Sequence, residues 1–353
     1  MTRKAVVRSL LAASAACWLV SGPLGTADAQ ETVRWKLASS YGSQIDVLGQ
    51  NILRVIDNIE AMSDGNFRIQ FNEPGALVPA LEVFDAVSAG SVDASYTTTG
   101  FHAGKVPHLI FFASVPFGPN VNEYLAWIEG GGGKELYDEY YAEHGIKGFQ
   151  CGIVVAESSG WFREPVASLD DLQGLKMRFF GLGADVMQKL GVSTQLLAGG
   201  DIYPALERGV IDAAEFSYPS LDQAHGFYQI AQHNYFPGWH QQASLVELIM
   251  NMERWNELPA SYQKIVEIAC GEANMWMMAS AEARQGEAIA FHQSKGVTIH
   301  QWPPEFIEAF RNAWQEVVEE RAAKDEKFKR IYDSYKSFRE TYSTWREVGY
   351  LKE

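Results

Sequence analysis

A helix-to-strand pattern that occurs twice constrains the fold of this chain more than any other feature. The segments SAGSVDASY and ERGVIDAAEF both run from a helix end through a glycine and an aspartate into a strand-like stretch. Gly90 in the first corresponds to Gly209 in the second. Asp93 corresponds likewise to Asp212. Either the segments share a common way of ending a helix, or each starts a strand in its own α/β lobe. In the second case both strand ends face one cleft, because open α/β sheets bind ligands beyond the carboxyl ends of their strands.

The surrounding elements support an α/β class. Residues 32–40 predict a strand, residues 45–62 carry apolar side chains at helical spacing, and residues 67–71 alternate as a half-buried strand does. This alternation of strand and helix is typical of a parallel-rich α/β layer. The C-terminal third is helical instead, with a long amphipathic region over residues 303–348. No low-complexity linker separates these parts, so we expect the chain to cross between the lobes several times.

The N-terminus indicates the compartment. Residues 1–29 have a basic start, an apolar stretch and an A-x-A arrangement ending at Ala29, which together predict a cleavable signal peptide and export to the periplasm. A membrane anchor is the less favoured alternative, because Ser21, Gly22 and Pro23 interrupt the apolar stretch. The formal net charge of −15 argues against nucleic acid and against anionic membranes as partners.

Cysteine usage leaves one question open. Cys17 lies in the expected signal peptide, so the mature chain would keep Cys151 and Cys270. Their spacing does not decide whether they form a disulfide. The sequence contains neither the HExxH motif of zinc proteases nor the GxSxG motif of serine hydrolases, and histidines 225, 233 and 240 are too loosely spaced to predict a metal site.

Arg178 carries the first indication of ligand chemistry. It follows an apolar stretch that predicts a buried strand, and Gly181 and Gly183 precede the next helix. A dinucleotide-binding turn would need a third glycine where Val186 stands, so no organic cofactor is expected. The glycine-rich run at 129–135 also departs from a phosphate-binding loop and indicates a turn into a helix. Arg178 therefore either pairs with a nearby acid or holds an anion itself.

Other polar residues in apolar surroundings are candidates for the same site. Glu157 precedes SSGWF, Glu215 ends the second repeated strand, and Gln241 follows FPGWH. Each has an ordinary alternative as a surface or ion-paired residue, and the neighbouring aromatic residues also suit a plain core. Two carboxylates could instead act as an acid–base pair in an exported enzyme.

The segment GGDIYPALERGVIDAAE resembles the extracytoplasmic solute-binding subunits of TRAP transporters, in the branch that binds 2-oxoacids and related carboxylates. EPGALVPALEVFDAVSAGSVDASY and YFPGWH extend the likeness over nearly the whole mature chain. The resemblance implies a non-enzymatic protein with a periplasmic-binding-protein-like α/β fold, in which hinge strands and long C-terminal helices join two lobes around a ligand cleft. On this basis we expect lobe I over 31–155 and about 215–252, and lobe II together with the C-terminal helices over about 156–214 and 253–353.

The resemblance also implies a site. A guanidinium at the position of Arg178 would hold the ligand's carboxylate, for which its planar fork is suited. A sodium or calcium ion would bridge ligand and protein. The expected metal ligands are Glu157, Glu215, Phe216 and Gln241. The expected ligand-binding residues are these four together with Arg178, Trp239 and Tyr96. Relative to the family, Gln has become Glu157, Glu has become Gln241 and Trp has become Phe216, so the number of charged ligands is kept.

The charges of this site favour a cation. If Glu157 and Glu215 are both ionised and Arg178 binds a monocarboxylate, two negative charges remain unbalanced, and a metal ion would relieve their repulsion. We therefore expect a binding protein that delivers a small organic carboxylate, a 2-oxoacid or a related hydroxyacid, to a TRAP membrane permease. A ligand sensor that docks on a receptor is the alternative. The long C-terminal helices are candidates for pairing two chains into a homodimer.

Overall fold

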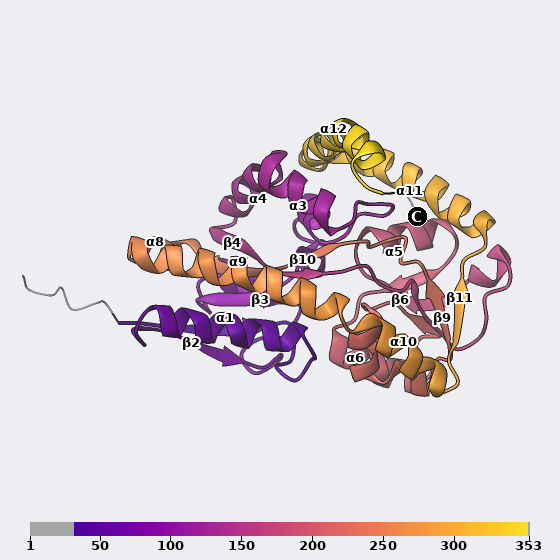
Figure 1. Cartoon of the computed structure of the whole chain (residues 1–353), viewed down its shortest axis with the longest axis horizontal. Coiled ribbons are helices and arrows are strands. Elements are labelled where there is room, and N and C mark those ends of the chain that lie inside the picture. The colour runs from indigo at the N-terminus through magenta and orange to yellow at the C-terminus, as the bar shows by residue number, and fades with distance from the viewer. Residues whose placement is uncertain (1–31, 352–353) are drawn as a thin grey trace, which may run out of the picture. The chain divides into compact units, whose positions relative to one another are not determined.

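Two β-sheets organise the described part of the chain (Figure 1). The computed structural model describes residues 32–351, so the expected signal peptide at 1–29 lies outside the described residues. The first sheet has the strand order β2-β1-β3-β10-β4, and the second has the order β11-β9-β5-β8-β6-β7. We call the parts built on these sheets the first and the second lobe. The mixed α/β class predicted from the sequence is confirmed.

The bounds of the elements are as follows. The strands of the first sheet are β1 (Val33–Ser39), β2 (Phe67–Asn72), β3 (Ala94–Thr97), β4 (Ile146–Val154) and β10 (Ser244–Asn251). Those of the second are β5 (Gly160–Phe162), β6 (Lys176–Arg178), β7 (Ser193–Gln195), β8 (Ala213–Ala214), β9 (His233–Phe236) and β11 (Thr298–Gln301). The α-helices are α1 (Leu48–Met62), α2 (Val83–Ser88), α3 (Val121–Gly130), α4 (Gly133–Ala142), α5 (Gly181–Lys189), α6 (Gly199–Glu207), α7 (Pro219–His225), α8 (Met252–Glu257), α9 (Ala260–Glu282), α10 (Gln285–Ser294), α11 (Pro304–Lys324) and α12 (Glu326–Val348). The 3-10 helices are η1 (Thr99–His102), η2 (Pro107–Phe112), η3 (Leu169–Leu172) and η4 (Phe227–Gln229).

The repeated pattern of the sequence builds the same structure in both lobes. Strand β3 runs parallel to β1, and β8 runs parallel to β6. The Oδ2 atom of Asp93 accepts a hydrogen bond of 2.7 Å from the main-chain N–H of Lys36, and Oδ2 of Asp212 accepts one of 3.1 Å from that of Lys176. Each aspartate N–H donates in turn to the carbonyl oxygen of the same lysine. The two segments are therefore equivalent strand starts, one in each lobe, and not merely similar helix ends.

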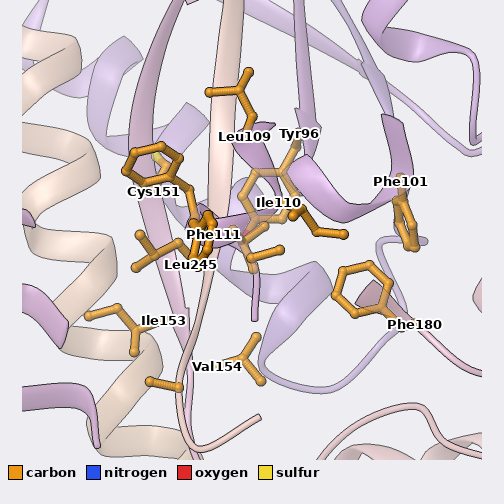
Figure 2. Close-up of a cluster of buried hydrophobic side chains, with 14 of the residues drawn as sticks. Tyr96, Phe101, Leu109, Ile110, Phe111, Cys151, Ile153, Val154, Phe180 and Leu245 are labelled. Atoms are coloured by element: carbon orange, nitrogen blue, oxygen red, sulfur yellow. The ribbon is translucent and has the colours of Figure 1, made fainter. Parts of the chain in front are cut away.

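The first lobe shows how the predicted helix is held. Ile52, Val55 and Ile59 recur at steps of three and four along α1 and are all fully buried. Burial of each such side chain contributes about 1.5–3 kcal/mol. The disulfide Cys151–Cys270 joins β4 to α9, which settles the pairing that the sequence left open. Figure 2 shows Cys151 within the buried apolar cluster of this lobe.

The chain passes between the two sheets several times. This agrees with the expectation drawn from a sequence in which no low-complexity linker separates the lobes. The chain leaves the first sheet after β4, returns between β9 and β10, and then passes through the long helix α9 to α10 and β11. The expected bounds gave 215–252 to the first lobe. Strand β9 lies within that range but pairs with β5 and β11 of the second sheet, so this crossing falls between β9 and β10. The other lobe bounds stay a prediction.

The C-terminal helices cover both lobes. Helix α11 packs against α5 of the second lobe, whereas α12 packs against η2 and α3 of the first (Figure 1). The long amphipathic region of the sequence breaks at Asp325, whose Oδ1 accepts hydrogen bonds from the N–H groups of Lys327 and Phe328 and caps α12. None of the helices between residues 32 and 351 combines the length and apolarity that crossing a membrane requires.

Candidate functional site

A small cavity lies between the two lobes, with a volume of about 40 Å³. It sits beyond the carboxyl ends of β1, β3, β6 and β8, where open α/β sheets bind their ligands. Tyr41, Thr98 and Phe101 line it from the first lobe. Arg178, Phe180 and Phe216 line it from the second lobe, and Gln241 lines it from the connector between β9 and β10. The two repeated strand ends therefore do share one cleft.

Arg178 is the last residue of β6 and is only 1 % exposed. Its Nη1 donates to the main-chain oxygen of Glu215 and, over 2.9 Å, to Oε2 of the same residue. Its Nε donates to the carbonyl oxygen of Leu197 over 3.3 Å. The rings of Phe180 and Phe216 lie 5.8 and 5.2 Å from the guanidinium carbon. Within residues 32–351 no hydrogen bond is made by Nη2, so one guanidinium nitrogen is left free where the sequence predicted a two-nitrogen fork.

Glu215 follows the short strand β8 and is fully buried. Its Oε2 also accepts a hydrogen bond of 3.0 Å from the main-chain N–H of Phe180. Burial acts to raise the pKa of Glu215, but the Arg178 guanidinium and His240 outweigh it and hold this pKa below its usual value. Arg178 therefore does pair with an acid, and it also faces the cavity.

Glu157 and His240 form a second buried pair on the two connectors between the lobes. The Nε2 atom of His240 lies 2.8 Å from Oε1 of Glu157 and 3.5 Å from Oε1 of Glu215. Burial raises the pKa of Glu157 to about 8. Burial alone would lower the pKa of His240, but its contacts with Glu157 and Glu215 raise it to about 9. Both pKa values lie above 7, so near neutral pH Glu157 is neutral, His240 is positively charged, and the pair carries one positive charge.

These protonation states change the expected charge balance. The charge count made from the sequence set two ionised carboxylates against Arg178 and left out His240. With Glu157 neutral and His240 charged, Glu215 balances Arg178 and the four side chains carry one positive charge. A monocarboxylate ligand would balance that charge, and a cation would bind by displacing the protons of Glu157 and His240, because metal ligands must be deprotonated.

The oxygen atoms of the site fit a hard cation. Among the residues that the structure describes, Oε2 of Glu157, Oε1 of Glu215 and Oε1 of Gln241 are buried without a hydrogen-bond partner. Buried oxygens without partners are costly, since each loses its hydration. Glu157, Glu215 and His240 also offer ligand atoms that all lie within 4.8 Å of one another. Carboxylate and amide oxygens are the ligands that calcium prefers, so the residues present fit the expected ion.

The remaining predicted residues fall into two groups. Gln241 is 4 % exposed and lines the cavity. The ring of Phe216 lies over the guanidinium, so Phe216 could reach an ion only through its main-chain oxygen. Trp239 does not line the cavity: its ring stacks on Phe310 with centroids 4.6 Å apart. Tyr96 does not line it either, because its hydroxyl accepts a hydrogen bond from Asn51 deep in the first lobe.

Several residues of the site were missed from the sequence. His240 was discounted because histidine spacing carried no motif, although it directly precedes the predicted Gln241. Tyr41 and Thr98 follow the ends of β1 and β3 by one or two residues. The strand-end argument that singled out Arg178 and Glu215 would have found both, had it been applied to the first lobe as well.

The fold and the cavity together define a two-lobed ligand-binding protein. The chain belongs to the bacterial extracellular solute-binding proteins of family 7, whose family model matches residues 38–325. This is the TRAP-transporter type of solute-binding protein, as the sequence resemblance predicted, and its members bind solutes and are not enzymes.

Three relatives are particularly informative. A monocarboxylate 2-oxoacid-binding periplasmic protein of Nostoc sp. is 37 % identical over 99 % of this chain and 97 % of its own length. A TRAP transporter solute-binding protein of Bordetella bronchiseptica, with copurified calcium and picolinate, has a TM-score of 0.88 at 36 % identity and covers 90 % of this chain and 95 % of its own. One from Pseudoalteromonas atlantica, with bound sodium and pyruvate, has a TM-score of 0.86 at 33 % identity and covers 89 % and 96 %.

Proposed function

We propose that this protein captures a small 2-oxo monocarboxylate, or a related hydroxyacid, together with a calcium or sodium ion in the interlobe cavity. One observation carries the proposal. Arg178 and Gln241 line the cavity, and the buried carboxylates of Glu215, which binds Arg178, and of Glu157, close to Glu215, each keep one oxygen without a hydrogen-bond partner. The guanidinium is a donor for an anion, and the oxygens are acceptors for a cation. A ligand that satisfies both must bring a carboxylate and a metal ion together.

A 2-oxoacid has the chemistry for this arrangement. Its carboxylate and its neighbouring carbonyl both present oxygen atoms, so it can offer oxygens to an ion while a carboxylate oxygen accepts from Arg178 Nη2. Glu157, Glu215 and Gln241 would hold the ion, and Phe216, which the family resemblance implies as a further ligand, would contribute its main-chain oxygen. When bound, the ion would take the place of the protons on Glu157 and His240 and neutralise the carboxylates around it. Calcium with picolinate and sodium with pyruvate in the two structural relatives support this pairing.

Ligand capture would couple the two lobes. The cavity is lined from both lobes and from one connector, so a bound ligand stabilises the arrangement in which the lobes are together. The closed form is then what a TRAP permease recognises at the membrane. The family's extracellular character supports a periplasmic location, reached through removal of residues 1–29. Intact mass of the exported protein checks this point, since the mature chain would begin at Gln30.

A homodimer through the C-terminal helices belongs to the same proposal. The end of the chain exposes apolar side chains, with Trp345 53 %, Val348 74 % and Tyr350 48 % exposed. Such a patch is typical of a surface that a partner covers. The Bordetella relative was described as a dimer. Light scattering of the full mature chain, compared with a form ending at Thr344, would test whether this end joins two copies.

Native mass spectrometry with elemental analysis tests the proposed function directly. We expect freshly purified protein to carry a small 2-oxoacid or hydroxyacid and one calcium or sodium ion per chain. Thermal unfolding with a panel of organic acids should then show a narrow set of stabilising ligands, dependent on the metal. A co-purified sugar or amine, or stabilisation that is indifferent to metal removal, would contradict the proposal.

A further inference from the structure

Two phenylalanine rings form one wall of the cavity. Phe101 comes from η1 of the first lobe and Phe180 follows β6 of the second, and both line the cavity. Their centroids lie 5.6 Å apart and the rings meet edge to face at 87°. Figure 2 shows them opposite each other, separate from the aliphatic cluster of the core. Each lobe therefore supplies one half of this wall.

A second cavity lies behind this wall. It has a volume of about 260 Å³, against about 40 Å³ for the ligand cavity, and Phe101 lines both. Its other walls include the exposed residues Gly104, Gln188 and Gln195, so we call it the outer cavity. Small and apolar side chains such as Ala103 and Ala184 line much of the rest. The Phe101 ring is thus what separates a tight inner site from a roomier space at the surface.

The close approach of Gly100 shows how tightly the wall is built. A Cβ atom on Gly100 would lie 2.1 Å from Cζ of Phe180. The backbone of Gly100 does not require glycine by its φ angle, so the reason is space for the ring. Since Gly100 and Phe180 belong to different lobes, this contact exists only while the lobes are together. The wall is therefore completed by closure.

The wall stands directly beside the group that would hold the ligand. The Phe180 ring lies 5.8 Å from the guanidinium carbon of Arg178. A carboxylate bound there leaves its carbon chain among the apolar residues that face it, with Phe101 and Phe180 limiting how far the chain extends. We propose that Phe101 and Phe180 set the maximum chain length of the ligand and restrict the protein to short 2-oxoacids. This inference rests on the proposed function and adds its size limit.

The outer cavity supplies the test. In Phe101→Ala the ring that separates the two cavities is removed, so a longer acyl chain would pass from the inner site into the outer cavity. Each buried methylene is worth about 0.8 kcal/mol, or about fourfold in affinity. We therefore expect wild type to bind pyruvate and 2-oxobutanoate and to bind 2-oxohexanoate at least about tenfold more weakly, and Phe101→Ala to recover that tenfold.

The experiment is a calorimetric titration of the calcium-loaded protein with pyruvate, 2-oxobutanoate, 2-oxohexanoate and 2-oxooctanoate. Phe101→Leu provides a milder variant if Phe101→Ala unfolds. The matched control is Phe67→Ala, a buried phenylalanine of the same lobe that lines neither cavity, which should keep the wild-type length profile. If both Phe101 variants bind pyruvate but keep the wild-type length profile, or if wild type prefers the longer acids, the size limit is overturned while the proposed function stands. If wild type binds none of the four acids, the proposed function fails and the size limit with it.

Discussion

The two lobes are built on the same local structure but bring different chemistry to the cavity. Asp93 and Asp212 fix equivalent parallel strands in the first and second lobe through the same pair of main-chain contacts. The first strand is followed by neutral Thr98, whereas the second is followed by Glu215, which binds Arg178. The second lobe and the two connectors hold every charged group of the site among the described residues. The first lobe supplies hydroxyl and aromatic side chains.

This difference indicates a division of tasks. The charged side holds the carboxylate and the cation, and the neutral side closes over them and limits their size. The first lobe does contain a buried carboxylate, Glu247, but it accepts hydrogen bonds of 2.6 Å from Tyr137 and from Tyr141 and does not line the cavity. Breaking the charged side should therefore abolish binding, while changes in the neutral side should leave binding in place and alter stability, lobe closure or selectivity.

Arg178→Ala should have the largest effect. Truncating one partner of a buried, hydrogen-bonded charge pair costs about 2–5 kcal/mol, so we expect affinity for the 2-oxoacid to fall by at least about 30-fold. The unfolding free energy should also fall by about 3–5 kcal/mol, because Glu215 is left as an uncompensated buried charge. Calorimetry and urea unfolding measure the two effects.

Two further variants support this test. Arg178→Lys keeps the charge and covers the case in which the alanine variant fails to fold. Arg254→Ala removes a half-exposed arginine that pairs with Asp93 and Glu257, and it should change affinity very little. A folded Arg178→Ala protein that binds within tenfold of wild type would contradict the assigned role of the charged side.

Glu247 predicts that the stability of the fold depends on pH. This carboxylate does not line the cavity, so the effect does not involve contact with the ligand. Burial raises its pKa from 4.5 to about 7, although its tyrosine hydrogen bonds act in the other direction. Between these pH values the unfolded chain loses a proton that the folded chain keeps, so this group lowers the unfolding free energy as pH rises through the window. Below pH 4.5 the folded and the unfolded chain both hold this proton, so the group no longer makes the unfolding free energy depend on pH.

Urea unfolding of wild type and Glu247→Gln across this range measures the effect. The variant lacks the titrating group, so its stability relative to wild type should rise between pH 4.5 and 7 by on the order of 3 kcal/mol. Exposed Glu319→Gln is the control and should run parallel to wild type. Parallel curves for Glu247→Gln as well would show that this carboxylate is not held protonated by the fold.

The exchanged charges at the cation site predict an intermediate effect. Glu157→Gln removes one carboxylate and should weaken calcium binding by about tenfold or more, because calcium affinity follows the charge of its ligands. Adding Gln241→Glu to that variant restores the number of carboxylates and should recover most of the loss. Calorimetry of calcium binding compares wild type, Glu157→Gln and the double variant. A double variant as weak as Glu157→Gln alone would show that Gln241 does not face the ion.

Gly100→Ala should have the smallest effect and should act on the neutral side. The added methyl group clashes with the Phe180 ring only when the lobes are together. Overpacking of this kind costs about 1–3 kcal/mol, so affinity for every ligand should fall by about tenfold with selectivity unchanged. The control Gly104→Ala places its methyl group in open space. Equal binding by both variants would mean that the Gly100–Phe180 contact contributes nothing to closure.

The sequence predicted the fold and part of the site, for identifiable reasons. Periodicity and glycine positions were enough for the strands and helices, and the strand-end rule led to Arg178 and Glu215. The sequence could not predict that Nη1 and Nε of Arg178 donate hydrogen bonds within the protein, because these bonds depend on how β6 and β8 pair.

Two details of the site show the same limit. Trp239 and His240 are neighbours in the sequence, yet only His240 contacts the buried carboxylates, since the fold of the connector decides which side chain turns inward. The wall formed by Phe101 and Phe180 joins residues from different lobes, and no local pattern in the sequence predicts such a contact.

A calorimetric titration of metal-stripped protein with pyruvate, before and after calcium is added, tests the joint binding of anion and cation. In the proposed site the carboxylate binds Arg178 and the cation binds the oxygens of Glu157, Glu215 and Gln241, so each ligand should favour the other. We expect calcium to strengthen pyruvate binding by at least about 100-fold, a coupling of about 2.7 kcal/mol. Pyruvate binding of equal strength with and without calcium would contradict this joint binding.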